Sequence, residues 1–208
     1  MPSKLFSSPI GKKMGMALTG LILYGFLIGH LLGNLLLLKG DGGQAFNAYA
    51  EFLINHPLII PAELFLVVVF LLHVYLAISV TRENRRARPV GYQATQSVGG
   101  RNFASYTMIY SGIIVLVFLV LHLKTFKYGD KAEGTLYDLV SATFQQTGYL
   151  VWYVIAMLVL GVHLWHAFQS AFQTLSVRSA KIRSLGLILC LILALGFGFL
   201  PVYLGILK

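Results

Sequence analysis

The sequence predicts an all-α integral membrane protein, in which residues 1–208 form one transmembrane domain with five membrane-spanning helices. Hydrophobic residues make up 57% of the 208 positions and charged residues only 11%, and the mean hydropathy is +0.77. The apolar residues form long runs, and about 20 such residues are enough for an α-helix to cross a bilayer. The net charge of +9 lies in the loops between these runs, as membrane topology requires, so we expect no nucleic-acid partner.

The predicted spans follow one another along the chain at about 15–38, 58–80, 103–123, 149–173 and 185–207. The apolar run of the first span is too long for a secretory signal peptide, so we expect this helix to be retained. Residues 44–56 form a short amphipathic or loop segment before the second span. The third span follows an arginine-rich loop over 82–101, the fourth follows a mixed-charge loop over 124–146, and the fifth follows a basic linker around 178–183.

The distribution of Lys and Arg predicts the orientation of the chain. With the N-terminus in the cytoplasm, the cytoplasmic segments hold eleven of the 16 basic residues and the outer segments hold five. Basic residues are concentrated on the cytoplasmic side of membrane proteins. We therefore expect the N-terminus inside and the C-terminus outside.

Each of the first four spans contains a histidine within apolar sequence, and these are His30, His73, His122 and His163. An ionisable side chain inside a membrane is costly and indicates a functional site. At 1.5 Å of rise per residue, His30 and His122 lie about 22 Å and about 28 Å from the cytoplasmic edge. His73 lies about 6 to 14 Å from that edge and His163 about 9 Å. The histidines thus form an outer pair, His30 with His122, and an inner pair, His73 with His163.

Each pair joins two helices at one level, which is the arrangement that axial coordination of a haem iron requires. Neutral imidazole is the commonest metal ligand, and a haem with both axial positions filled suits electron transfer. Zinc fits less well, because it needs about four ligands in one cluster. Cys190 is the single cysteine and no CxxCH motif is present, so this chain alone cannot hold an iron-sulfur cluster or a covalently attached haem.

His166 and Gly33 are further candidates for contacts with a haem. His166 lies three residues beyond His163 on nearly the same helix face, so it competes as a ligand or contacts a propionate or water. Gly25, Gly29 and Gly33 form a flat groove along the first span. This groove indicates close helix packing, room for a flat cofactor beside His30, or both.

Several short motifs occur in a fixed order along the chain. They are GKKMGMALTG (11–20) before GHLLGN (29–34), AELF (62–65) before LHVY (72–75), LH (121–122) and HLWHAFQSAFQT (163–174). Together with one histidine on each of the first four spans and none on the fifth, they resemble one known family over the whole chain. This is the five-helix, di-haem cytochrome b anchor subunit of succinate:quinone oxidoreductases, meaning succinate dehydrogenases and fumarate reductases.

The resemblance implies two haems b bound by the first four helices. His30 and His122 would ligate the outer, distal haem, and His73 and His163 the inner, proximal haem. The family does not require histidine at position 166, which favours His163 as the ligand. The resemblance also implies a prokaryotic cytoplasmic membrane as the location, with a flavoprotein subunit and an iron-sulfur subunit on its cytoplasmic side. It further implies a quinone substrate, usually menaquinone, and assembly of the complex into a higher oligomer.

The chain itself would anchor these partners, hold the haems and provide the quinone site. Reduction of a quinone couples two electrons to two protons, so a carboxylate at the membrane edge near a haem is the obvious candidate. Glu63 lies at the outer end of the second span, about level with the outer pair. The arginines of 82–101 offer a surface for an acidic partner, for haem propionates or for anionic lipids.

Two other interpretations remain at the level of the sequence. The first is a di-haem cytochrome b subunit of another respiratory complex, such as a nitrate reductase or formate dehydrogenase, whose histidines lie on fewer helices. The second is a haem-free transporter in which the histidines relay protons. Such a transporter predicts internal repeats or broken helices at mid-membrane, and the sequence shows no such repeat.

Overall fold

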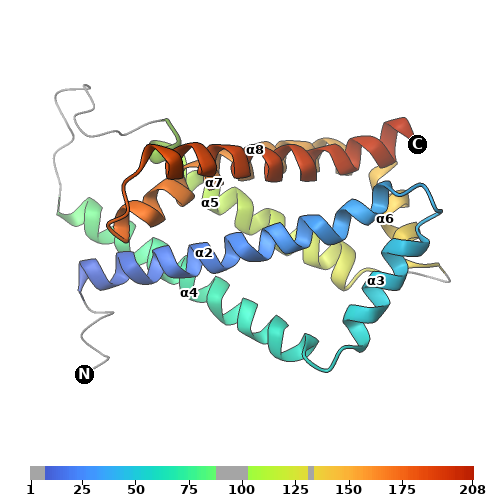
Figure 1. The fold of residues 1–208 in the computed structure, drawn as a ribbon, viewed down its shortest axis with the longest axis horizontal. Helices are drawn as coiled ribbons and strands as arrows, with labels where there is room; N and C mark the ends of the chain where they lie inside the picture. The colour runs from blue at the N-terminus through green and yellow to red at the C-terminus, as the bar shows by residue number, and fades with distance from the viewer. Residues whose placement is uncertain (1–7, 88–102, 131–133) are drawn as a thin grey trace.

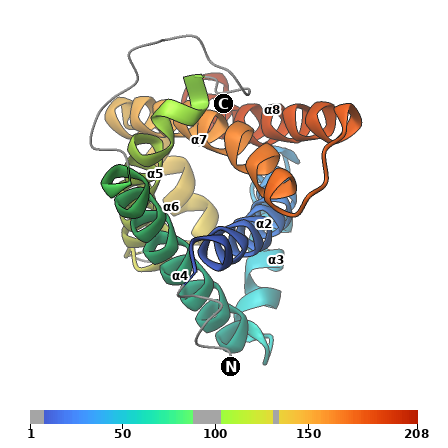
Figure 2. The ribbon, with the colours of Figure 1, turned by 90° about the vertical axis from the view of Figure 1, so that its left-hand side faces the viewer.

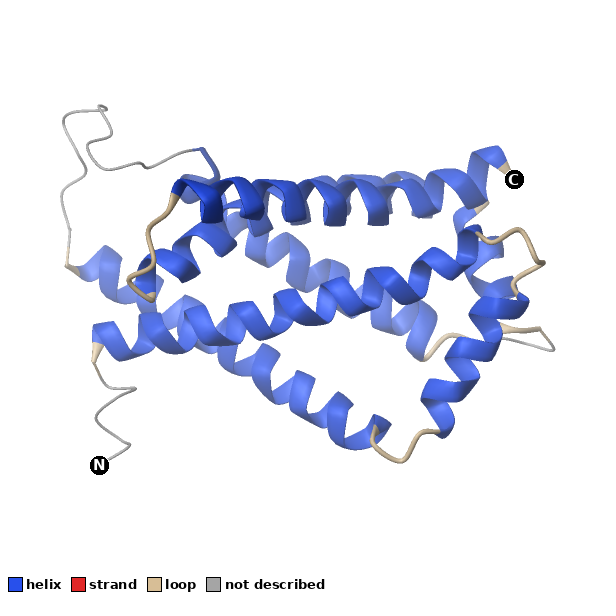
Figure 3. Ribbon diagram, in the orientation of Figure 1, coloured by secondary structure: helices blue, strands red, loops and turns tan. Residues whose placement is uncertain are grey.

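The computed structural model describes residues 8–87, 103–130 and 134–208, and the regular structure in these ranges is entirely helical (Figures 1 and 3). Five helices are long and apolar enough to cross a membrane. They are α2 (Pro9–Asn34), α4 (Ile59–Arg86), α5 (Phe103–His122), α7 (Thr147–Thr174) and α8 (Ala180–Val202). The prediction of an all-α protein with five candidate spans is therefore confirmed.

Three of these helices continue into a short turn of another helix type. They are α2 with the 3₁₀ turn η1 (Leu35–Leu38), α5 with the π-helical turn η2 (Leu123–Lys127) and α8 with the π-helical turn η3 (Tyr203–Leu207). The predicted spans are accurate in position but shorter than several helices. For example, α2 begins at Pro9, because the Ser8 side chain accepts a hydrogen bond from the Gly11 N–H (3.0 Å) and proline is favourable at the first helical position.

Viewed end-on, α2, α4, α5 and α7 surround the axis of the molecule, and α8 lies outside them (Figure 2). Helix α2 packs against α4 and α7, α5 packs against α7, and α4 touches α5 less extensively. Helix α7 is the most buried of the five and α5 the least. The first four long helices thus form a bundle in which neighbours in sequence run in opposite directions.

Helix α8 approaches the bundle closely through small residues. A Cβ at Gly161 of α7 would lie 2.9 Å from the Cβ of Ala194, so only glycine permits this spacing. The Cys190 thiol donates a hydrogen bond to the Gly161 carbonyl (3.0 Å) across the same contact. The sulfur is buried and engaged in packing, which agrees with a structural role for this cysteine.

Two short helices, α3 (Gln44–Asn55) and α6 (Leu136–Phe144), lie at the end of the bundle opposite the start of α2 (Figure 1). We call this the capped end, and the other the N-terminal end. Asn47 joins the two short helices by accepting the Tyr137 N–H (3.0 Å). Helix α6 starts with a capping box, in which hydrogen bonds from Thr135 hold the pKa of the exposed Asp138 carboxyl below its ordinary value.

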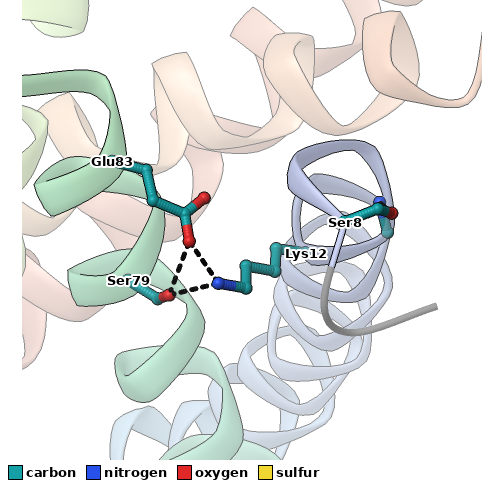
Figure 4. A network of polar contacts seen from close by, with 5 residues as sticks. Ser8, Lys12, Ser79 and Glu83 are labelled. Carbon is teal, nitrogen blue, oxygen red and sulfur yellow. Dashed lines mark hydrogen bonds and ion pairs between the residues drawn. The ribbon is translucent and has the colours of Figure 1, made fainter. Parts of the chain in front are cut away.

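A different ion pair lies at each end of the bundle. At the N-terminal end, Lys12 of α2 forms an ion pair with Glu83 of α4 and donates a hydrogen bond to Ser79 (2.9 Å) (Figure 4). At the capped end, Lys127 of η2 forms an ion pair with Glu63 near the start of α4. One ion pair therefore ties α4 to α2 at one end, and the other ties α4 to the end of the α5 segment.

Candidate functional site

The outer pair comes together between α2 and α5. The rings of His30 and His122 lie edge to face with their centroids 5.9 Å apart. The hydroxyl of Tyr153, on α7, lies 3.4 Å from Nδ1 of His122, and the Asn34 amide lies 3.5 Å from both ring nitrogens of His30. The structure therefore brings together the two histidines that depth counting assigned to one level.

Aromatic rings surround the outer pair. Phe26 stacks on the His30 ring at a centroid distance of 5.3 Å, and Phe197 of α8 lies 5.6 Å from it. Phe118 and Phe126 lie 5.6 Å and 5.4 Å from His122. The setting is apolar and aromatic, which suits the faces and edges of a large flat ring better than a hydrated ion.

The inner pair lies nearer the N-terminal end, where α4 and α7 carry His73 and His163. Nδ1 of His73 is 3.1 Å from the Thr19 hydroxyl on α2, and Nδ1 of His163 is 3.1 Å from the Ser111 hydroxyl on α5. Each inner histidine is thus contacted through Nδ1 by a side chain of a neighbouring helix.

The spacing of the outer pair, though not the edge-to-face orientation of its rings, is compatible with two axial ligands of one iron. Metal–imidazole bonds of about 2 Å place the ring centroids of two opposed imidazoles about 6 Å apart, and the observed separation is 5.9 Å. The described residues contain no group of three or more His, Cys, Asp or Glu that could hold a metal ion. Two imidazoles per site are sufficient for a haem, because the porphyrin supplies the other ligands.

The remaining predicted residues lie in different surroundings. His166 lies on α7, three residues beyond His163. Gly33 packs against α3, because a Cβ there would collide with the Tyr49 ring, and this contact explains the small residue. A Cβ at Gly25 or Gly29 would meet no atom within 4 Å, so the open part of the predicted groove lies there. Arg88 and Arg101 of the predicted basic surface lie outside the described residues.

A cavity of about 580 Å³ opens at the capped end beside the outer pair, and sequence reasoning did not find it. Its wall includes Leu121, which precedes His122, and the polar side chains of Lys124, Gln146 and Tyr149. It also includes Trp152, whose buried indole N–H has no hydrogen-bond partner among the described residues. These residues resemble ordinary interfacial anchors in the sequence, so only the fold reveals that they share a cavity.

Comparison of the chain with protein-family models, with curated proteins and with solved structures finds no match.

Proposed function

We propose that this chain is the membrane-anchor cytochrome b subunit of a respiratory complex II, a succinate dehydrogenase or fumarate reductase. In this role it holds two haems b and passes electrons between an iron-sulfur subunit and a membrane quinone. The observation that carries the proposal is the juxtaposition of His30 and His122, from two helices, at the spacing of two ligands of one metal. The inner pair, His73 and His163, likewise comes from two helices, α4 and α7.

The residues have separate parts in this proposal. His30 and His122 ligate the outer haem, and His73 and His163 ligate the inner haem. A bound haem supplies reversible one-electron chemistry, and with two histidine ligands it leaves no open position for oxygen. The protein orients the imidazoles, keeps water away with aromatic and aliphatic side chains, and leaves the surface of the bundle free for lipid.

The orientation places the N-terminal end of the bundle in the cytoplasm. This end carries the basic residues Lys12, Lys13, Arg85, Arg86 and Arg183, among others, whereas most acidic residues lie at the capped end. The positive-inside rule supports the N-in, C-out topology. The flavoprotein and iron-sulfur subunits then dock beside the inner pair, in a prokaryotic cytoplasmic membrane.

The quinone site belongs at the capped end, beside the outer pair. Glu63 lies there in an ion pair with Lys127, and the cavity wall includes Lys124 from the same η2 turn. The quinone, which we take to be menaquinone as is usual for di-haem anchors, needs hydrogen-bond donors at its carbonyls and a route for protons. The Lys124 ammonium is such a donor, and Glu63 is the candidate proton carrier.

The first experiment is a spectrum of the purified protein. We expect the dithionite-reduced minus oxidised spectrum to show b-type haem, and extraction to yield two haems per chain. We also expect flavin and iron-sulfur subunits to copurify when the membranes are solubilised gently. A properly folded but colourless protein would overturn the proposal and favour the haem-free transporter.

A further inference from the structure

The buried polar side chains of the described residues point to a second set of residues at the inner pair. There are three of them, Thr19, Ser111 and Thr143. Thr143 bonds only within its own helix, where its hydroxyl donates to the Leu139 carbonyl (2.7 Å). Thr19 and Ser111 each have an additional contact with Nδ1 of an inner histidine, and both contacts are 3.1 Å long.

Each hydroxyl also lies within hydrogen-bond distance of a carbonyl of its own helix, to which it can donate its only proton. Thr19 Oγ1 lies 2.8 Å from the Gly15 carbonyl and 3.1 Å from the Met16 carbonyl. Ser111 Oγ lies 3.1 Å from the Met108 carbonyl. A hydroxyl has one proton and two lone pairs, so a hydroxyl that donates to a carbonyl of its own helix meets the imidazole as an acceptor. The imidazole must then carry its proton on Nδ1.

We propose that Thr19 and Ser111 are positioning residues, which hold His73 and His163 in the Nδ1–H tautomer and thereby present Nε2 as the metal-binding atom. A neutral histidine with its proton on Nδ1 has its lone pair on Nε2. A hydrogen-bond acceptor at the other ring nitrogen fixes the orientation of a metal-bound histidine and raises its basicity. The binding of a haem iron at Nε2 rests on the proposed function, whereas the assignment of the Nδ1–H tautomer does not depend on it.

A repeated sequence pattern supports the same assignment. A hydroxyl residue followed by glycine precedes the outer histidine by the same number of residues in two helices, from Thr19 to His30 in α2 and from Ser111 to His122 in α5. The spacing is about three helical turns, so the hydroxyl and the histidine lie on one face.

Both glycines of this pattern lie against the rings, and a side chain would be crowded at Gly20 but not at Gly112. A Cβ at Gly20 would lie 3.2 Å from Cε1 of His73, and one at Gly112 would lie 3.5 Å from Cε1 of His163. Helices α2 and α5 therefore do the same two things. Each supplies one histidine of the outer pair and orients one histidine of the inner pair.

The tautomer is tested without haem. In the haem-free full-length protein in detergent micelles, ¹⁵N NMR of labelled histidine should show His73 and His163 as Nδ1–H tautomers. Thr19→Val should release His73 from this state, Ser111→Ala should release His163, and Thr143→Val should change neither. Nε2–H tautomers in the unaltered protein, or spectra insensitive to Thr19→Val and Ser111→Ala, would overturn the proposal.

The haem-loaded protein gives a second readout. Thr19→Val keeps the shape of the side chain but removes the acceptor, so we expect the inner haem to bind about 10- to 100-fold more weakly. Its midpoint potential should rise, because a less basic ligand stabilises ferric iron less. Thr19→Ser should restore both properties, and the outer haem should be unaffected. If Thr19→Ser behaved like Thr19→Val, the role would be packing alone and the proposal would be wrong.

The two proposals fail in different ways. An unaltered protein that binds no haem would overturn the cytochrome function but leave the NMR result intact. Normal haem binding with the opposite tautomer would overturn only the role of Thr19 and Ser111.

Discussion

A neutral imidazole has one donor nitrogen and one acceptor nitrogen, and in lipid both need partners. Nδ1 has a neighbour in the inner histidines, through Thr19 and Ser111, and in His122, through Tyr153. Ligation of a metal by Nε2 would then give both nitrogens of these imidazoles a partner. The proposed ligation would therefore give these buried imidazoles partners that packing alone does not provide.

Single replacement of the histidines tests this assignment. Leucine at position 30 or 122 should remove only the outer haem, and leucine at position 73 or 163 only the inner haem. The two members of a pair should give the same residual spectrum, and the spectra of the two pairs should differ. His166→Leu is the control and should retain both haems. Loss of the inner haem in that variant, with retention in His163→Leu, would reverse our choice of ligand on α7.

The carboxylate of Glu63 permits a test that leaves the haems unaltered. Glu63→Gln removes the charge and the proton carrier, so quinone turnover should fall at least several-fold while the haem spectrum and haem content stay the same. Lys127→Gln is the control, because it breaks the same ion pair but keeps the carboxylate. Unchanged turnover in Glu63→Gln would remove Glu63 from the quinone chemistry.

Sequence reasoning identified residues whose type is unusual in a membrane and missed residues whose type is ordinary. His30 and His122 stand out in apolar helices, and their depth could be counted from the predicted spans. Thr19 and Ser111 do not stand out, because a hydroxyl in a helix can bond to its own backbone and needs no tertiary partner. The repeated hydroxyl-glycine pattern was visible in the sequence, but its meaning depends on which helix lies opposite.

At the scale of the helices, composition predicted well where each membrane-spanning helix lies in the chain. It predicted poorly the residues at which the helices begin and end. Helix α4 continues to Arg86, beyond the predicted end at position 80, because charged residues are good helix formers once they are outside the bilayer. The capped end was the least predictable part. A tight turn at Gly43 (φ +86°) lets α3 start under the Tyr137 ring, and such a contact between distant segments leaves no local pattern.

The ion pair at the N-terminal end fixes the contact between α2 and α4. Lys12 is mostly covered, with 13% of its side chain exposed, whereas Glu83 is 38% exposed. Lys12→Met should therefore lower stability by only about 1 kcal/mol, measured as thermal unfolding in detergent. Lys13→Met, at the exposed neighbouring position, is the control and should have little effect. Equal losses in both variants would show that general charge, and not this contact, is responsible.

At the scale of the whole molecule, the proposed topology has a direct test. The buried Cys190 is first replaced by serine, and single cysteines are then placed at Lys39 and at Arg178, which lie at opposite ends of the bundle. We expect a membrane-impermeant maleimide to label Lys39→Cys in intact cells and Arg178→Cys only after the membrane is opened. The reverse pattern would place the partner subunits on the wrong side and contradict the N-in orientation.

The matching roles of α2 and α5 also affect the order in which the proposed sites form during synthesis. Helices α2 and α4 are consecutive long helices and pack together, so Thr19 can orient His73 as soon as both have left the ribosome. Helices α5 and α7 complete the same contact later, between Ser111 and His163. Helices α2 and α4 together carry one histidine of each pair, and so do α5 and α7. Neither set of two helices therefore supplies both proposed ligands of one haem. Synthesis of α7 is thus the earliest point at which both sites are complete, and a chain truncated before it should retain at most the outer one.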